Sequence, residues 1–287
     1  MYLALYRKWR PRVFSDVVSQ EHITRTLQNQ IRTGRTAHAY LFTGSRGTGK
    51  TTCSKILAKA VNCLHPVDGN PCLECSACKG IEDGSILDVV EMGAASNNSV
   101  VDVRELRDEA SYAPSVCKYR VYIIDEVHML STSAFNALLK IMEEPPPHVL
   151  FILATTEVHK VPQTIVSRCQ QYDFRRIRPA DSARRMLEIS EQEEFTLEPD
   201  AAALIARLAD GGMRDALSLL DQCAAFSDHI DLRTVADTAG IAGSEHLFAL
   251  SGAILQKDAA AAISKVGELY DNAKGVDRLV SELIGHF

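Results

Sequence analysis

The sequence lacks any long apolar run. No part of the 287-residue chain comes near the roughly 18 consecutive apolar residues that a membrane-spanning helix needs. The segment from Met1 to Arg10 also lacks the apolar stretch of a secretion signal. These two absences argue against a membrane or secreted protein, so we expect a cytoplasmic protein that makes no membrane contact.

The sequence also lacks an excess of positive charge, since its formal net charge is -6 at pH 7. A protein that covers nucleic acid with its whole surface would be basic, so any DNA contact must be confined to one region. Internal repeats and low-complexity tracts are absent as well. With 46% hydrophobic and 24% charged residues, the composition is that of a globular protein with one large domain and one or two small ones.

Cysteine is present, but not in the pattern of a disulfide framework. Of eight cysteines, four fall within sixteen residues, at Cys63, Cys72, Cys75 and Cys78. In a long chain without a secretion signal, this grouping favours a metal site over disulfides. Four thiolates favour a closed tetrahedral Zn²⁺ site with a structural role. An iron–sulfur cluster and unliganded thiols remain the alternatives.

Short apolar runs rich in β-branched residues alternate with helical patterns in the first part of the chain. Such runs are typical of buried parallel strands, and the alternation predicts an α/β fold with a parallel sheet. The strands are expected at 39–43, 86–90, 121–125, 149–154 and 171–174, and the helices at 51–62, 101–113 and 133–144.

Beyond residue 178 the pattern becomes helical, with no convincing strand. Helices are expected at 181–194, 200–210 and 213–226. We therefore predict a core at residues 1–178, a small helical domain at 179–242, and the beginning of a third helical domain at 243–287. Because the chain stops at Phe287 without an obvious ending, we expect a larger parent protein.

One motif points to phosphate chemistry. Residues 44–51 read G-S-R-G-T-G-K-T, follow the first expected strand and open a helix. Glycines let the loop bring backbone N–H groups against phosphate oxygens, where the helix N-terminus adds positive charge. Lys50 would reach the β- and γ-phosphates and Thr51 would bind Mg²⁺. The residues predicted to hold ATP are Gly44, Ser45, Arg46, Gly47, Thr48, Gly49, Lys50, Thr51 and the adjoining Thr52.

Two carboxylates close the third expected strand. Asp125 and Glu126 should emerge at the sheet edge where ligands of open α/β folds bind. Asp125 suits the outer coordination of Mg²⁺, and Glu126 suits a general base that activates water. The pair makes ATP hydrolysis the leading reaction.

Together these motifs resemble the gamma/tau subunits of the bacterial DNA polymerase III clamp loader. The resemblance rests on the phosphate loop, the four-cysteine insertion after its helix, the D-E-V-H run from Asp125, and Ser167-Arg168-Cys169, and it covers residues 1–225. It implies an AAA+ ATPase that works in a hetero-pentamer with related subunits. Such a loader opens a ring-shaped sliding clamp and places it on primed DNA.

The resemblance also implies roles for single residues. Thr156, with Thr155 as the alternative, corresponds to the first sensor of the γ-phosphate. Arg168 corresponds to the arginine finger that completes the site of a neighbouring subunit. Arg214 corresponds to the second sensor, which lies on the small helical domain at 179–242, the lid of the ATPase. Adenine contacts are expected from residues 6–11 and from the 16–18 turn, which includes Val18.

The expected DNA and partner contacts are less specific. DNA would meet residues 95–103 and Lys140, although 95–99 carry no basic residue, so the grip there would rest on backbone and hydroxyl groups. The third domain would begin the collar that holds the ring together. A polymerase or helicase partner would bind beyond Phe287.

Three alternatives stay open from the residues alone. A different AAA+ ATPase of DNA replication or repair would share the same core. A nucleotide-gated scaffold that does not hydrolyse ATP would lack some of Lys50, Thr51, Asp125 and Glu126, which are all present. A phosphotransferase would need an acceptor motif, and we find none.

Overall fold

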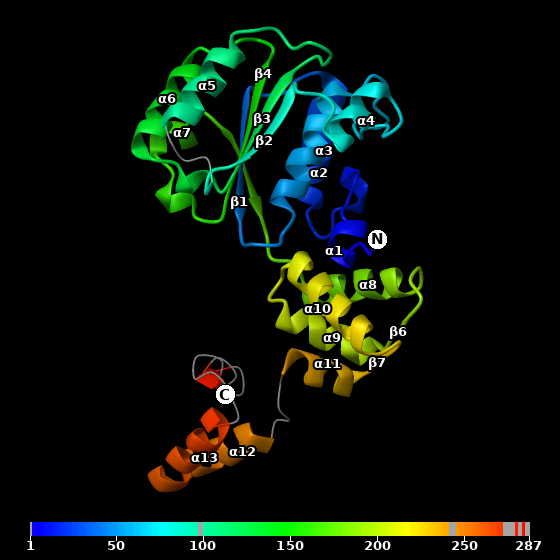
Figure 1. Ribbon diagram of the computed structural model, residues 1–287, viewed down its shortest axis with the longest axis vertical. Coiled ribbons are helices and arrows are strands. Elements are labelled where there is room, and N and C mark those ends of the chain that lie inside the picture. Colours follow the sequence, from blue (N-terminus) through cyan, green and yellow to red (C-terminus); the bar gives the residue numbers. More distant parts are fainter. Residues whose placement is uncertain (1, 97–99, 241–244, 272–278, 281–282, 285–287) are drawn as a thin grey trace.

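The computed structural model describes residues 2–96, 100–240, 245–271, 279–280 and 283–284. Within them, a sheet with helices on both faces is followed by a group of short helices and then by a helical pair (Figure 1). The fold is therefore α/β with a helical continuation, as the alternation of patterns predicts. The domain limits drawn from the sequence stay predictions.

The sheet has five parallel strands in the order β2-β3-β4-β1-β5. Because all run the same way, their carboxyl ends meet at one edge, which is where open α/β folds bind ligands. This edge carries the loop after β1, Asp125 at the end of β3 and Thr155 at the end of β4. The strands are β1 Ala39–Gly44, β2 Val89–Gly93, β3 Arg120–Asp125, β4 Val149–Thr155 and β5 Gln170–Phe174.

Each face of the sheet has its own apolar core. Helices α2 (Glu21–Thr33) and α3 (Lys50–Asn62) cover one face, where Leu27 and Ile56 are fully buried. Helices α5 (Val100–Ala110) and α6 (Thr132–Glu143) cover the other, together with the short α7 (Gln163–Val166). Burial on both faces explains why the central strands read as continuous apolar runs.

A second group of helices forms a separate core. It contains α8 (Pro179–Ser190), α9 (Pro199–Leu208), α10 (Met213–Phe226) and α11 (Leu232–Ala239). Leu5 of the amino-terminal helix α1 (Leu5–Lys8) packs into this core. The first residues of the chain therefore bridge the two groups, and Figure 1 shows them between the sheet and α8.

The remaining elements are short or lie at the end of the described chain. They are the 3₁₀ turns η1 Phe14–Asp16, η2 Val127–Met129 and η3 Val158–Lys160, with α4 Ser76–Asp83, α12 Glu245–Leu255 and α13 Ala259–Asp271. In the part of the chain that is described, no helix is long and apolar enough to cross a bilayer.

Two expectations about strands were wrong. The run 86–90 is not a buried strand, because β2 begins only at Val89 and lies at the edge of the sheet, while Leu87 is 81% exposed. The helical group also contains a strand pair, β6 Thr196–Leu197 and β7 His229–Ile230, which is too short to leave a pattern in the sequence.

Asp88 lies directly before β2. Its side chain is fully buried and accepts backbone N–H groups from Ser115, Val116 and Cys117 at 2.8–2.9 Å. A carboxylate that gathers three donors ties the residue before β2 to the segment before β3. Burial alone would raise the pKa of Asp88, but these N–H groups hold it below its ordinary value.

We predict that Asp88→Ala lowers the free energy of unfolding by about 2 kcal/mol, because three N–H donors, of which that of Cys117 is buried, lose their acceptor. Because the folded pKa is lowered, the stabilisation by Asp88 is present above its ordinary pKa of about 4 and is lost as pH falls through the folded value. Urea unfolding at several pH values measures both effects. An unfolding free energy for Asp88→Ala within about 0.5 kcal/mol of the parent would contradict this account.

Candidate functional site

The loop after β1 has the tight geometry that its glycines allow. Gly44 has φ +133°, and a Cβ there would overlap the carbonyl oxygen of Phe174 on β5. Gly47 has φ +76°, and a Cβ there would lie 2.9 Å from the Cα of Gly212. No larger residue fits at either position, so this loop and its neighbours are built for close backbone approach.

Lys50 lies under this loop. Its side chain is 5% exposed, and its ammonium donates hydrogen bonds of 2.8 Å to the carbonyls of Gly44 and Ser45. Burial lowers the pKa of Lys50, while the charges of Glu126 and Asp125 oppose that shift. The cation is thus held at the loop by two carbonyls and faces two carboxylates.

Thr51 and Asp125 meet at the sheet edge. The Thr51 hydroxyl donates to Asp125 Oδ2 at 2.8 Å, and Asp125 Oδ1 accepts the backbone N–H of Glu126 at 3.0 Å. A hydroxyl beside a carboxylate is the oxygen donor set that Mg²⁺ prefers with phosphate. These residues therefore fit a bound Mg²⁺, and the strands bring them together from distant parts of the sequence.

Glu126 is held by the end of β4. Its backbone is in the left-handed region at φ +50°, and its Oε2 accepts the hydroxyl of Thr156 at 3.0 Å and the Thr156 N–H at 3.3 Å. This contact distinguishes Thr156 from Thr155, the two residues that the sequence offered for the first sensor. Thr156 contacts Glu126, whereas the Thr155 hydroxyl lies 2.9 Å from Nδ1 of His128.

Sequence reasoning gave His128 no function. Its side chain is only 6% exposed and lies between two carboxylates, with Nδ1 3.4 Å from Glu126 Oε2 and Nε2 3.2 Å from Glu157 Oε2. No sequence signal could have identified this contact, because Glu157 belongs to the loop after β4. His128 thus links Glu126 to the segment that leads to α7.

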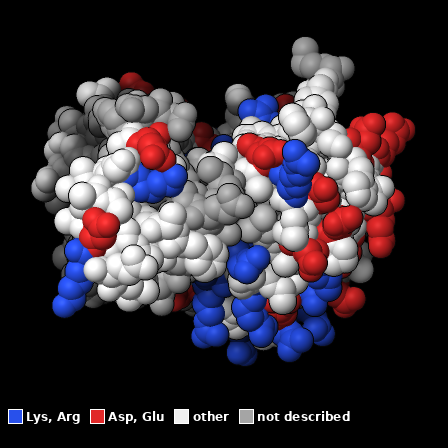
Figure 2. Space-filling model, turned by 90° about the horizontal axis from the view of Figure 1, so that it is seen from below, with Lys and Arg blue, Asp and Glu red and all other residues white. Residues whose placement is uncertain are grey.

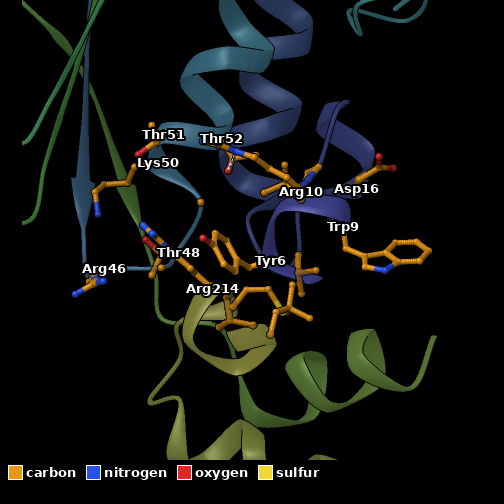
Figure 3. A pocket seen from close by; sticks show the side chains of 18 of the residues that line it. Tyr6, Trp9, Arg10, Asp16, Arg46, Thr48, Lys50, Thr51, Thr52 and Arg214 are labelled. Carbon is orange, nitrogen blue, oxygen red and sulfur yellow. Dashed lines mark hydrogen bonds between the residues drawn. The ribbon is translucent and has the colours of Figure 1, made fainter. Parts of the chain in front are cut away.

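A cavity of about 850 Å³ opens over the loop. Its walls come from the loop, the amino-terminal segment and α10, as Figure 3 shows. The lining includes most of the predicted binding residues, namely Arg46, Gly47, Thr48, Gly49, Lys50, Thr51, Thr52, Val18, Asp125, Glu126 and Arg214.

The amino-terminal wall is fixed by polar contacts. The Trp9 indole N–H donates to Glu193, which follows α8, at 2.6 Å, and Arg10 Nε donates to the Thr52 hydroxyl at 3.2 Å. Tyr6 and Val18 line the same cavity. Apolar and aromatic surface facing a phosphate loop suits a planar base, in the region where the sequence predicts adenine contacts.

The helical group touches the loop directly. The N–H of Met213, at the start of α10, donates to the Gly47 carbonyl at 3.0 Å. One residue on, Arg214 projects to the cavity and places its guanidinium 5.2 Å from the centre of the Tyr6 ring. Any displacement of α10 therefore moves a backbone contact of the loop and a cation at the same time.

Arg168 lies apart from this cavity. It follows α7, where Nη2 donates to Glu143 Oε1 at 2.9 Å and Nη1 donates to the Thr164 carbonyl at 2.8 Å. Its side chain is 34% exposed. The structure thus brings Arg214 to the candidate site and leaves Arg168 on the surface, away from the chain's own loop.

The four cysteines come together after α3. The Sγ atoms of Cys63, Cys72, Cys75 and Cys78 all lie within 4.8 Å of one another. Three backbone N–H groups point at the sulfurs, as Cys72 donates to Cys63, Cys75 to Cys72 and Cys78 to Cys75 at 3.2–3.4 Å. Burial would raise the pKa of Cys75, but N–H donors from Leu64 and Cys78 bring it to about 6. Four convergent sulfurs, with N–H donors directed at three of them, fit a tetrahedral Zn²⁺.

The structure describes only part of the segment that is expected to contact DNA. Residues 97–99 lie outside the described residues, while Ala95, Ser96 and Lys140 are exposed. Figure 2 shows basic side chains gathered at one edge of the face seen there, with acidic ones elsewhere on it. The charge on this face is therefore unevenly distributed, as a regional DNA contact would require.

A phosphate loop at the carboxyl edge of this parallel sheet, followed by a helical lid, defines a P-loop ATPase of the AAA+ class. Comparison with known families agrees. The family described as "DNA polymerase III, delta subunit" matches residues 19–178, and that described as "DNA polymerase III clamp loader subunit, ATPase lid domain" matches residues 183–229. The chain belongs to the gamma/tau family of DNA polymerase III clamp-loader subunits.

Named relatives support this. The chain is 52% identical to DNA polymerase III subunit tau of Bacillus subtilis, strain 168. The match covers 100% of this chain and 51% of that protein. It is 41% identical to the Escherichia coli K12 subunit tau, over 99% of the chain and 44% of that protein. The chain therefore spans about half the length of these relatives. The RuvB Holliday junction branch migration motor of Thermotoga maritima shares the fold, with TM-score 0.60 and 18% identity over 86% of this chain and 79% of that one.

We predict that the purified protein contains about one Zn²⁺ per chain, because four thiolates saturate a tetrahedral ion. Elemental analysis by mass spectrometry measures the metal. Cys72→Ser should lower the zinc content and the melting temperature, whereas the matched Cys169→Ser, away from the cluster, should keep the zinc. Iron with inorganic sulfide in place of zinc would show that the competing cluster assignment is right.

Proposed function

We propose that this chain is the ATP-binding and ATP-hydrolysing motor subunit of a bacterial clamp loader, which loads the sliding clamp onto primed DNA. The observation that carries the proposal is the grouping at one sheet edge of Lys50, the Thr51–Asp125 pair and the Thr156–Glu126 pair beneath a cavity of about 850 Å³. These are the groups that hydrolysis of a Mg-nucleotide requires.

ATP binding would use the loop and the amino-terminal wall. The base would lie against Tyr6 and Val18, and the loop N–H groups would hold the phosphates at the start of α3. Lys50 would turn from the Gly44 and Ser45 carbonyls to the β- and γ-phosphates. Bound Mg²⁺, next to Thr51 and Asp125, would supply charge neutralisation on the phosphate oxygens.

Hydrolysis would depend on Glu126. As a general base it would orient the attacking water and accept its proton. Thr156 would keep the carboxylate in place through the two hydrogen bonds described above, and would sense the γ-phosphate because a phosphate oxygen competes for the same hydroxyl. Thr156 would thereby make the position of Glu126 depend on the nucleotide.

The lid would report the nucleotide through α10. Arg214 lies on the first turn of this helix and faces the cavity, while the preceding residue is bonded to the Gly47 carbonyl. A γ-phosphate that draws Arg214 inward would close the lid on the core, and its loss would release it.

The neighbouring subunit would be reached by Arg168. Its ion pair with Glu143 is partly exposed on both sides, and such pairs are worth only about 0–1 kcal/mol. A γ-phosphate on an adjacent subunit is a stronger bidentate partner for a guanidinium. Assembly would therefore move Arg168 from Glu143 to the neighbour's nucleotide.

The partners in this proposal are those of a loader: related subunits in a hetero-pentamer, the sliding clamp and primer-template DNA. The region from about residue 243 would contribute to the collar that joins the subunits, and a polymerase or helicase would be a further partner. The zinc site would be structural, because four protein ligands leave no open position. A replicative role would place the protein in the cytoplasm.

Two other functions find less support. A nucleotide-gated scaffold would not need Glu126 held by Thr156 next to the phosphate loop. A different AAA+ ATPase of DNA replication or repair shares the core, but the likeness to RuvB concerns the fold alone at 18% identity. Stimulation by the clamp separates that alternative from a loader.

We predict that Glu126→Gln abolishes most ATP hydrolysis while ATP still binds, since the amide cannot accept the proton of water but keeps the size of the side chain. Removal of a general base typically costs about 10²–10⁴-fold in rate. Single-turnover hydrolysis and nucleotide retention measure the two effects. The matched Glu194→Gln, at an exposed position, should behave as the parent. Undiminished hydrolysis by Glu126→Gln would refute the assigned base.

The function as a whole is tested by ATP hydrolysis of the assembled loader. We expect clamp and primed DNA together to stimulate ATP hydrolysis strongly. We also expect Arg168→Ala subunits to lower the hydrolysis rate by about 10³-fold at each ATP site whose neighbouring subunit carries the change, while nucleotide binding is retained. Arg25→Ala, an exposed change on α2, is the matched control.

Two results would contradict the proposal. If the assembled loader binds nucleotide but its ATP hydrolysis is not stimulated by clamp and DNA, the result would favour the scaffold or another AAA+ role. Equal rates of ATP hydrolysis in rings with and without Arg168→Ala subunits would show that Arg168 does not act at the ATP site of a neighbouring subunit. The rest of the proposal would stand.

A further inference from the structure

The loop between the first two cysteines contains a tight hairpin. Val67 and Asn70 exchange both backbone hydrogen bonds, at 3.0 and 2.8 Å, around Asp68 and Gly69. Both central residues have positive φ, +50° at Asp68 and +79° at Gly69. This is the Asp-Gly turn of a two-residue hairpin, which holds a single shape.

The tip of this hairpin is pressed against α2. A Cβ on Gly69 would lie 2.5 Å from the carbonyl oxygen and 2.7 Å from the Cα of Gln28. Gly69 itself is buried. The turn therefore has no room to shift toward α2, and only its attachment to the cysteine loop limits movement in the opposite direction.

From this fixed turn, Asn70 reaches the amino-terminal segment. Its side-chain oxygen accepts the backbone N–H of Phe14 at 2.9 Å, at the start of η1. Phe14 is 1% exposed and packs with α2 and α3. No side chain caps η1 from its own N-cap residue, Val13. The side-chain oxygen of Asn70, in the cysteine loop, thus accepts the N–H group at the start of η1 in place of an N-cap side chain.

The segment that begins at Phe14 is a wall of the candidate ATP site. Asp16, Val17 and Val18 line the cavity, and Cγ1 of Val17 lies 3.8 Å from where a Cβ on Gly49 would be. Only a few residues therefore separate the Asn70 contact from the phosphate loop.

A second connection runs along α3. This helix begins at Lys50 and is capped by Cys63, so its two ends belong to the phosphate loop and the cysteine cluster. Near the cysteine end, Lys59 is 4% exposed and pairs with Glu82 of α4 at 2.5 Å. The cysteine cluster is thus tied to the nucleotide cavity by α3 and by Asn70.

We propose that Asn70 is a positioning residue for nucleotide binding, and that metal held by the four cysteines raises nucleotide affinity by fixing the hairpin that carries Asn70. The proposal rests on the proposed ATP site and adds a regulator to it. Because coupling between two sites is reciprocal at equilibrium, bound nucleotide must also raise the affinity of the cysteine cluster for its metal. A purely structural cluster would affect stability and leave the affinity of the folded protein unchanged.

The first test compares three variants by calorimetric titration with a non-hydrolysable Mg-ATP analogue. Asn70→Ala removes the acceptor, and we expect its dissociation constant to rise about five-fold, the effect of one lost hydrogen bond. Asn70→Asp keeps an oxygen acceptor at the same place and should bind within about two-fold of the parent. Asn29→Ala, an exposed asparagine change on α2, is the matched control and should bind as the parent.

The second test removes the metal. A chelator strips zinc, the protein is desalted, and Mg²⁺ is then restored before titration. We expect weaker nucleotide binding by the stripped parent and a smaller loss of affinity on stripping Asn70→Ala. At equilibrium with a competing chelator, the parent should keep more zinc when the analogue is bound. Circular dichroism at the titration temperature checks that each sample is folded. If Asn70→Ala is unfolded there, the stripped parent and Asn70→Asp decide the question.

The outcomes separate the two proposals. Asn70→Ala and zinc-stripped parent that are less heat-stable but bind the analogue as tightly as the parent would overturn the role of Asn70 and the metal, while the ATP site would stand. A parent that binds no better than Lys50→Ala would overturn the ATP site itself.

Discussion

The parallel pairing of β3, β4 and β1 is the constraint on which the site depends. Because the three strands run side by side in one direction, the residue that ends each one reaches the same edge. The Thr51–Asp125 hydrogen bond and the Thr156–Glu126 contact both follow from that register. A shift of one residue in either pairing would turn these side chains to the opposite face and separate the groups that need to meet.

The lid and the surface arginine extend this arrangement in two directions. Through the Met213 N–H and Arg214, α10 contacts the phosphate loop from within the same chain. Arg168 points away from it and forms a weak ion pair with Glu143. His128 touches both Glu126 and Glu157, and the chain after Glu157 leads through α7 to Arg168.

Sequence reasoning succeeded where chemistry depends on residues close together along the chain. The phosphate loop, the Asp125–Glu126 pair and the four cysteines each lie in one short segment, so their spacing was enough to predict the groups that the structure brings together. The central strands were predictable for a similar reason, because burial on both faces leaves a continuous apolar run. The start of α10 at Met213 followed from the Gly211-Gly212 break.

The contacts that escaped prediction join distant segments. The buried carboxylate of Asp88 accepts N–H groups of Ser115 to Cys117, which lie far along the chain from it. His128 acquires its neighbours only when β4 lies beside β3, and Asn70 meets Phe14 only after the cysteine loop folds back on α2. Local pattern holds no information on such pairs. The assignments of Thr156, Arg168 and Arg214 came from the family resemblance, and spacing alone would not have found them.

Trp9 has a practical consequence of its own. It is the only tryptophan in the sequence, it lines the cavity over the phosphate loop, and its indole N–H donates to Glu193, which follows α8 in the helical group. Indole emission responds to the polarity and hydrogen bonding around the ring. The protein therefore contains a single indole fluorophore at the contact between its amino-terminal segment and its helical lid, and selective excitation of tryptophan would report a movement of the lid without any attached label.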